Sequence, residues 1–179
     1  MQKTWVRAVT TLLTLGVMLM IFMFSTEKAE KSDATSGVVA EWVAEKIEPE
    51  YKKMPEPQKT SFFKEVQYIV RKCAHFTEFA LLGCSMRLCL ESWFGALDKN
   101  PGKRRKKFWL LALLAWLGGT GYAALDEIHQ TMVDGRTGRP LDVLIDSSGV
   151  LTGTLITLLA LWFFLYRRKN ADFLRAFGS

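Results

Sequence analysis

Histidine and cysteine are scarce in this chain, which limits the metal and redox chemistry available to it. The 179 residues include two histidines and three cysteines. Cys73, Cys84 and Cys89 show no C-x-x-C spacing and fall within one predicted helix, so we interpret them as buried thiols rather than as a disulfide or a metal site. The zinc-protease motif H-E-x-x-H is also absent. We expect no metal and no cofactor, with a divalent cation held by histidines and carboxylates as the alternative.

The chain also lacks the elements of a nucleotide- or nucleic-acid-binding protein. The tetrad D-E-I-H at 126–129 resembles a helicase motif, but no phosphate-binding G-x-x-x-x-G-K-[ST] precedes it. Lysine and arginine outnumber the acids by 24 to 18. Two basic blocks, 103–107 and 167–169, flank apolar segments, which is typical of membrane topology rather than of a nucleic-acid surface.

Long apolar runs are what the chain does contain, and they define its class. Hydrophobic residues make up 49% of the sequence and are concentrated in segments close to the roughly 20 residues that cross a bilayer as a helix. We predict a single all-α domain over 1–179, an integral membrane bundle of four transmembrane helices plus an extracytoplasmic amphipathic helix. The predicted spans are about 5–24, 67–94, 108–130 and 141–166.

The first span resembles a signal peptide, but its apolar run Ala8–Phe24 is longer than the usual h-region and no small-x-small cleavage site follows. We therefore expect a retained anchor. Segment 27–65 follows, with an amphipathic helix predicted over Gly37–Ile47. The prolines after it predict a loop up to Lys59, with Thr60 or Ser61 as the N-cap of the next helix.

The second span is unusual because its longest uncharged run, Phe79–Met86, is too short to cross a bilayer. The helix spans only if charged residues are included, and Arg71, His75 and Glu78 then share one face. Groups of this kind face a protein interior or a watery cavity, because exposure to lipid costs several kcal/mol for each. Arg87 and Glu91, near the other end, are interpreted as topology determinants.

The positive-inside rule orients the four spans. Both termini and the basic block 103–107 are predicted to be cytoplasmic, whereas 27–65 and 130–140 are predicted to be extracytoplasmic. The polar ends of the second, third and fourth spans then emerge on the same side of the membrane. We expect them to meet in one site, which would contain both histidines.

The predicted site combines acids and bases at one depth, as general acid–base chemistry requires. Candidate catalytic residues are His75, Glu78, Asp126, Glu127 and Asp142. Candidate substrate-binding residues are Arg71, Lys72, His129, Gln130, Arg136, Arg139 and Asp146. The two arginines of G-R-T-G-R at 135–139 suit a phosphate or carboxylate.

Structural explanations remain open for parts of this set. His75 and Glu78 could pair within the membrane only to lock helices together. The carboxylates of Asp142 and Asp146 could fix the loop by pairing with its arginines, and Lys72 could extend to lipid head groups. Small residues on the third and fourth spans, including Gly119, Gly149 and Gly153, predict close helix packing beneath the polar groups.

At these positions the chain resembles the VanZ-like family of small bacterial membrane proteins. The matching pieces are Phe24-Ser25, R-K-C-A-H-F-T-E-F at 71–79, D-E-I-H-Q at 126–130 and G-R-T-G-R-P-L-D-V-L-I-D-S-S-G at 135–149, with Gly153 following. The resemblance implies a multi-pass protein of the bacterial cell membrane and, for the founding member, raised resistance to teicoplanin. The family motif positions are Lys72, His75, Glu78, Asp126, Glu127, Gln130, Arg136, Asp142 and Gly149. Position 146 is often Asn in the family, so the resemblance implies no shared catalytic role for Asp146.

Two classes of function fit these observations. In the first, an outer-leaflet site binds or modifies an anionic, membrane-linked cell-envelope substrate; Arg136 and Arg139 hold the anion, Glu78 or Asp126 acts as base, and His75 relays a proton. In the second, a non-catalytic module recognises a lipid-linked cell-wall precursor, a lipoglycopeptide or a partner protein. Expected partners are membrane lipids and no nucleic acid, and the sequence leaves both enzyme activity and oligomeric state open. A transporter is disfavoured by the small number of spans and the lack of an internal repeat.

Overall fold

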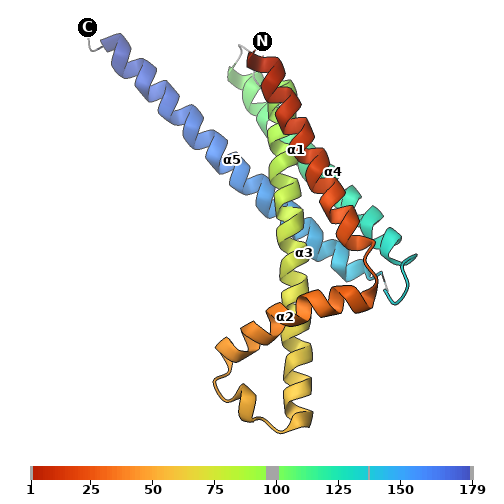
Figure 1. Ribbon diagram of the computed structural model, residues 1–179. Coiled ribbons are helices and arrows are strands. Elements are labelled where there is room, and N and C mark those ends of the chain that lie inside the picture. Colours follow the sequence, from red (N-terminus) through yellow and green to blue (C-terminus); the bar gives the residue numbers. More distant parts are fainter. Residues whose placement is uncertain (1, 96–100, 137, 178–179) are drawn as a thin grey trace.

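The computed structural model describes residues 2–95, 101–136 and 138–177, and its described elements are helical throughout, in agreement with the predicted all-α class (Figure 1). The elements are α1 (Gln2–Ser25), α2 (Ala29–Ile47), the short 3₁₀ helix η1 (Tyr51–Lys53), α3 (Glu56–Phe94), α4 (Pro101–Gln130) and α5 (Pro140–Phe177). The longest helix, α3, forms the centre, with α1 and α4 alongside its second half. The helix α5 crosses α3 and diverges from it, and α2 lies across α3 nearer its beginning.

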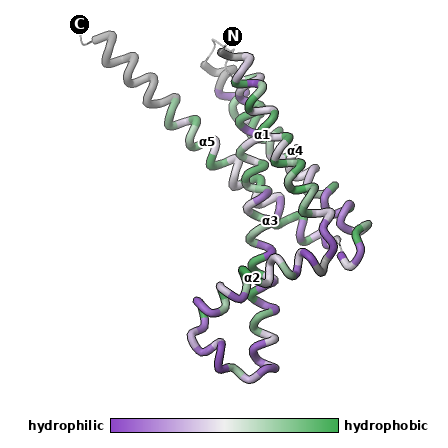
Figure 2. Tube along the Cα trace, viewed as in Figure 1, coloured by the Kyte–Doolittle hydropathy of each residue, from purple (hydrophilic) through white to green (hydrophobic). Residues whose placement is uncertain are grey.

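Within the described residues, three helices are long and apolar enough to cross a membrane: Thr4–Ser25, Arg105–Gln130 and Pro140–Phe164. They correspond to the first, third and fourth predicted spans. The remaining prediction, 67–94, lies within α3, which is continuous there but is not among the three. Figure 2 shows that the opposite end of the molecule from the termini, with α2, η1 and the beginning of α3, is largely hydrophilic.

The segment between α1 and α3 is more helical than the sequence predicted. The helix α2 covers Ala29–Ile47 rather than only Gly37–Ile47, and η1 interrupts the predicted loop. The prediction of Thr60 or Ser61 as the N-cap of α3 was wrong, because Pro55 is the N-cap and Pro57 lies in the first turn. A proline is tolerated there because the first backbone N–H groups of a helix have no intrahelical acceptor.

The amphipathic helix α2 packs on α3 through its small residues. Ala40 and Ala44 are fully buried in a cluster with Val66, whereas Val38 and Trp42 on the other face are exposed. The hydroxyl of Tyr51 donates a hydrogen bond of 2.9 Å to Glu41 Oε2. Burial, together with this carboxylate, raises the pKa of Tyr51 to about 12. The hairpin formed by α2, η1 and α3 is therefore tied together on its inner face.

The crossing of α3 and α5 depends on glycine. A Cβ atom added at Gly149 would overlap the backbone carbonyl oxygen of Phe76, and one added at Gly153 would overlap that of Ala80. At the same crossing, a Cβ at Gly83 would overlap the carbonyl of Val150. The two backbones are thus in direct contact, as the small residues of the fourth span predicted. Around this crossing, Ile21, Phe79, Leu82, Ala123 and Val150 from four helices form a buried core.

Two expectations about side chains of α3 were wrong. Arg87 is fully buried rather than a surface determinant of topology; its Nη1 lies 2.7 Å from Glu91 Oε2, and its guanidinium lies over the ring of Phe108. The cysteines are all free, as expected, but Cys73 is exposed and Cys84 is only partly buried. The Cys84 thiol donates to the carbonyl of Gly153 at 3.2 Å, which adds a contact to the α3–α5 crossing.

We predict that Gly153→Ala destabilises the purified protein, because its methyl group would separate α3 from α5. Overpacking of this kind typically costs about 1–3 kcal/mol. Gly121→Ala on α4 is the matched control, since nothing lies within 4 Å of its added Cβ. It should be neutral or stabilising by about 0.5–1 kcal/mol, the usual difference between Gly and Ala in a helix. Thermal unfolding in detergent measures both, and equal midpoints for the two variants would contradict the close crossing.

Candidate functional site

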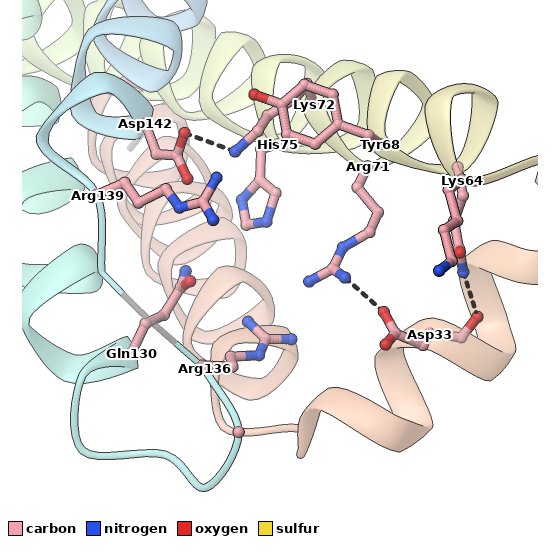
Figure 3. Close-up of a pocket in the computed structure, with 12 residues that line it drawn as sticks. Asp33, Lys64, Tyr68, Arg71, Lys72, His75, Gln130, Arg136, Arg139 and Asp142 are labelled. Carbon is pink, nitrogen blue, oxygen red and sulfur yellow. Dashed lines mark hydrogen bonds and ion pairs between the residues drawn. The ribbon is translucent and has the colours of Figure 1, made fainter. Parts of the chain in front are cut away.

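A cavity of about 400 Å³ lies where α2, α3, the loop after α4 and the beginning of α5 meet (Figure 3). It is large enough for a small-molecule head group rather than only a single ion. Its walls are formed by charged and polar side chains from segments far apart in the sequence. The lining residues are Asp33, Lys64, Gln67, Tyr68, Arg71, Lys72, His75, Gln130, Gly135, Arg136, Arg139 and Asp142.

Positive charge dominates the cavity wall. Five lysine or arginine side chains and two aspartates line it, which leaves a net formal charge of +3 with His75 neutral. The loop places Arg136 through Gly135, whose φ of 77° lies in the left-handed region that favours glycine. Arg136 Nη2 donates to the carbonyl of Phe24 at 3.2 Å, while its buried Nε has no acceptor in the described structure. Burial lowers the pKa of Arg136, and the neighbouring Arg71 lowers it further.

Two ion pairs connect the walls of the cavity. Lys72 Nζ lies 2.5 Å from Asp142 Oδ1, joining α3 to α5. Arg71 Nη1 lies equally close to Asp33 Oδ1, joining α3 to α2 (Figure 3). Asp142 therefore pairs with Lys72 rather than with an arginine of the loop, and Lys72 is engaged within the protein. Asp33 was not predicted; it lies in segment 27–65 before the predicted helix Gly37–Ile47, and nothing in the sequence connected it to the site.

The charged side chains of the cavity wall form its rim. Beneath this rim lies a buried acidic layer from α4 and α5, consisting of Asp126, Glu127 and Asp146. Gln130 Nε2 donates to Asp126 Oδ2 at 2.8 Å, and the backbone N–H of Arg139 donates to Glu127 Oε2 at 2.8 Å. Both carboxylate oxygens of Asp146, which is 1% exposed, are buried without a partner in the described structure. It pairs with neither loop arginine.

The polar face of α3, formed by Arg71, His75 and Glu78, connects the rim to this layer. His75 lines the cavity, and its buried Nδ1 has no hydrogen-bond partner within the described residues. Glu78 is half-buried one turn further on and lies within electrostatic range of Asp126 and Arg136. His75 is coupled in the same way to Asp126 and Arg136. Side chains from α3, α4 and the loop therefore converge, as predicted.

His129 is placed differently from the other predicted residues. Its ring packs against Phe22 of α1 with the centroids 4.9 Å apart, and it is not among the residues that line the cavity. Its Nε2 is buried without a partner in the described part of the chain. Of the two histidines expected in the site, His75 lies in the cavity wall, whereas His129 lies against the first helix and does not line the cavity.

The described residues contain no group of three or more His, Cys, Asp or Glu side chains in an arrangement that could hold a metal ion. The buried carboxylates nevertheless lie close enough to influence one another, since Asp146 is coupled electrostatically to Glu127, Asp126 and Asp142. The carboxyl groups of the acidic layer and the imidazole of His75 are groups that exchange protons, and the arginines of the cavity wall are groups that bind anions.

The helices and the site together define a helical membrane protein with a charged cavity at one end of its apolar bundle. The family model described as VanZ/LLP1 matches residues 10–164, and the chain belongs to this family. The match includes every residue of the cavity wall and of the acidic layer. Comparison with curated proteins and with solved structures gave no match.

We predict that Lys72→Ala destabilises the bundle by about 1–3 kcal/mol, because it leaves the carboxylate of Asp142 without its partner in a mostly buried position. The reversed pair, Lys72→Asp with Asp142→Lys, should recover part of this loss. Lys31→Ala breaks an exposed pair with Glu27 and should cost no more than about 0.5 kcal/mol. Chemical or thermal unfolding measures each variant. Failure of the reversed pair to recover any stability would indicate that the two charges act independently.

Proposed function

We propose that this VanZ-family membrane protein binds the anionic head group of a membrane-linked cell-envelope substrate in its charged cavity and acts on it by acid–base chemistry. The observation that supports this most directly is the composition of the cavity wall, in which cationic side chains exceed carboxylates by three. An uncompensated positive cavity favours an anionic ligand. The proposal places the cavity on the extracytoplasmic side, following the charge bias of the flanking segments.

A membrane-linked ligand suits the position of the cavity. The apolar helices α1, α4 and α5 extend from one end of the hydrophilic region in which the cavity lies (Figure 2). A head group could therefore occupy the cavity while its hydrocarbon chain remains in the bilayer beside the helices. A soluble anion would gain nothing from this arrangement.

The roles within the site follow from position. Arg136 and Arg139 would hold the anion at the rim. Glu78 of α3 or Asp126 of the acidic layer would act as the base, with His75 as a proton relay. In this scheme Gln130 orients Asp126 through their hydrogen bond of 2.8 Å.

The alternative is a binding module without catalysis, which would recognise a lipid-linked precursor, an antibiotic or a partner protein. The ion pairs between Lys72 and Asp142 and between Arg71 and Asp33 favour it, because paired charges are already used to hold helices together. Teicoplanin resistance, the property of the founding family member, is compatible with either function and serves as a cellular measurement for both.

We predict that Arg139→Ala weakens binding of anionic lipid by at least about 10-fold, the cost of losing one charge-assisted hydrogen bond. Arg139 lines the cavity and forms no ion pair within the described residues, so its loss should spare the fold. Arg105→Ala, at the other end of α4, removes an exposed arginine and should leave binding unchanged. Native mass spectrometry of protein extracted with its lipids measures retention. Equal retention by both variants would exclude the cavity as the binding site.

We predict that Glu78→Gln and Asp126→Asn abolish activity in cells but leave lipid binding within about 3-fold, because each amide keeps the shape of the acid and loses its proton transfer. Asp134→Asn is the control, since its side chain is exposed on the loop and lies outside the cavity. Envelope-lipid composition and growth on teicoplanin measure activity. Amide variants that act like the wild-type protein would favour the binding module.

A further inference from the structure

The cavity contains cations that the protein does not neutralise. Lys72 and Arg71 each have a carboxylate partner, but Lys64, Arg136 and Arg139 form no ion pair within the described residues. Arg136 is the least satisfied of them, since its buried Nε has no acceptor among the described residues. Burial, and after it the charge of the neighbouring Arg71, lowers the pKa of Arg136. An anion between these two guanidiniums would relieve the repulsion.

We propose that the anionic group bound here is a phosphate or diphosphate, and that the carboxylate of Asp33 on α2 competes with it for Arg71. This inference rests on the proposed function and narrows its substrate to one chemical class. Figure 3 shows Arg71, Arg136 and Arg139 extending into the same space, with Asp33 at the end of Arg71. The segment that carries Asp33 thus closes one wall of the cavity.

The amount of charge favours phosphate over carboxylate. A single carboxylate would leave two of the three unpaired cations uncompensated, whereas one phosphate monoester carries about −1.5 to −2 at neutral pH. A diphosphate brings the total close to the excess of +3 in the wall. Guanidinium groups also match the oxygens of phosphate with paired, parallel hydrogen bonds. The cavity volume of about 400 Å³ leaves room for two phosphoryl groups.

Asp33 is suited to the role of an internal competitor. Its carboxylate is partly exposed, and α2 is held beside it through hydrogen bonds from Gln67 Nε2 to the carbonyl of Asp33, at 2.8 Å, and to Ser36 Oγ, at 3.1 Å. A phosphate that binds Nη1 of Arg71 takes the place of this carboxylate. Binding would therefore free α2 from one of its links to α3 while leaving the contacts of Gln67 in place.

The test measures binding of inorganic pyrophosphate to the full chain in nanodiscs of phosphatidylcholine by titration calorimetry. Pyrophosphate should bind at least about 10-fold more tightly than citrate, which offers comparable charge on carboxylates alone. Asp33→Asn should tighten pyrophosphate binding by about 3- to 10-fold, because it removes the competing charge, and Arg139→Ala should weaken it by about 10-fold. Asp134→Asn, which removes an exposed carboxylate from the loop, should change nothing.

A second arm separates a lipid from a soluble ligand. Phosphatidic acid added to the nanodiscs should compete with pyrophosphate, whereas phosphatidylserine, whose phosphate is a diester, should compete less. If pyrophosphate binds but phosphatidic acid does not compete, the phosphate inference stands and the membrane-linked substrate of the proposed function is wrong. If citrate binds as well as pyrophosphate, or Asp33→Asn fails to tighten binding, the phosphate inference is overturned, while Arg139-dependent retention of anionic lipid would still support the proposed function.

Discussion

The direct backbone contact between α3 and α5 is the constraint on which the rest of the structure depends. The backbone of Phe76 contacts Gly149 and that of Ala80 contacts Gly153. One turn earlier on α3, Lys72 forms its ion pair with Asp142 near the start of α5. Positions increase together along both helices, so α3 and α5 run in the same direction. The termini accordingly lie at the same end of the molecule (Figure 1). Without glycine at the crossing, the acidic start of α5 could not lie against the basic stripe of α3.

Charge at this end of the bundle is tolerated because the helices arrange it in two layers. Cations predominate at the rim, where the cavity admits water, and carboxylates are buried below, where hydrogen bonds from Gln130 and from the backbone of Arg139 reach two of them. Asp146 is the exception, since its oxygens have no donor in the described structure. A buried carboxylate without donors is costly when ionised, so Asp146 is the side chain least explained by helix packing alone.

Periodicity and small residues were sufficient to predict the helical class, three apolar spans and the convergence of polar residues from α3, α4 and the following loop. They could not identify the partner of Asp142, because that partner depends on the position of α5 along α3, which the glycine contacts determine. Asp33 was missed for the same reason, since its contact with Arg71 exists only once α2 folds back across α3. The start of α3 at Glu56 was missed because proline, present at positions 55 and 57, favours both a loop and the first turn of a helix.

The helix α2 contributes Asp33 to the rim of the cavity and no residue to the acidic layer, so its position bears on anion binding rather than on proton transfer. This helix continues almost directly from α1 and crosses α3, with Asp33 on its cavity side and Trp42 exposed on its surface. Buried alanines, hydrogen bonds from Gln67 and the ion pair to Arg71 all hold it on α3, and only the last of these engages a cation of the rim. If an anion binds that cation, the helix loses one of its links and keeps the others. The phosphate inference therefore couples the position of α2 to the presence of a ligand.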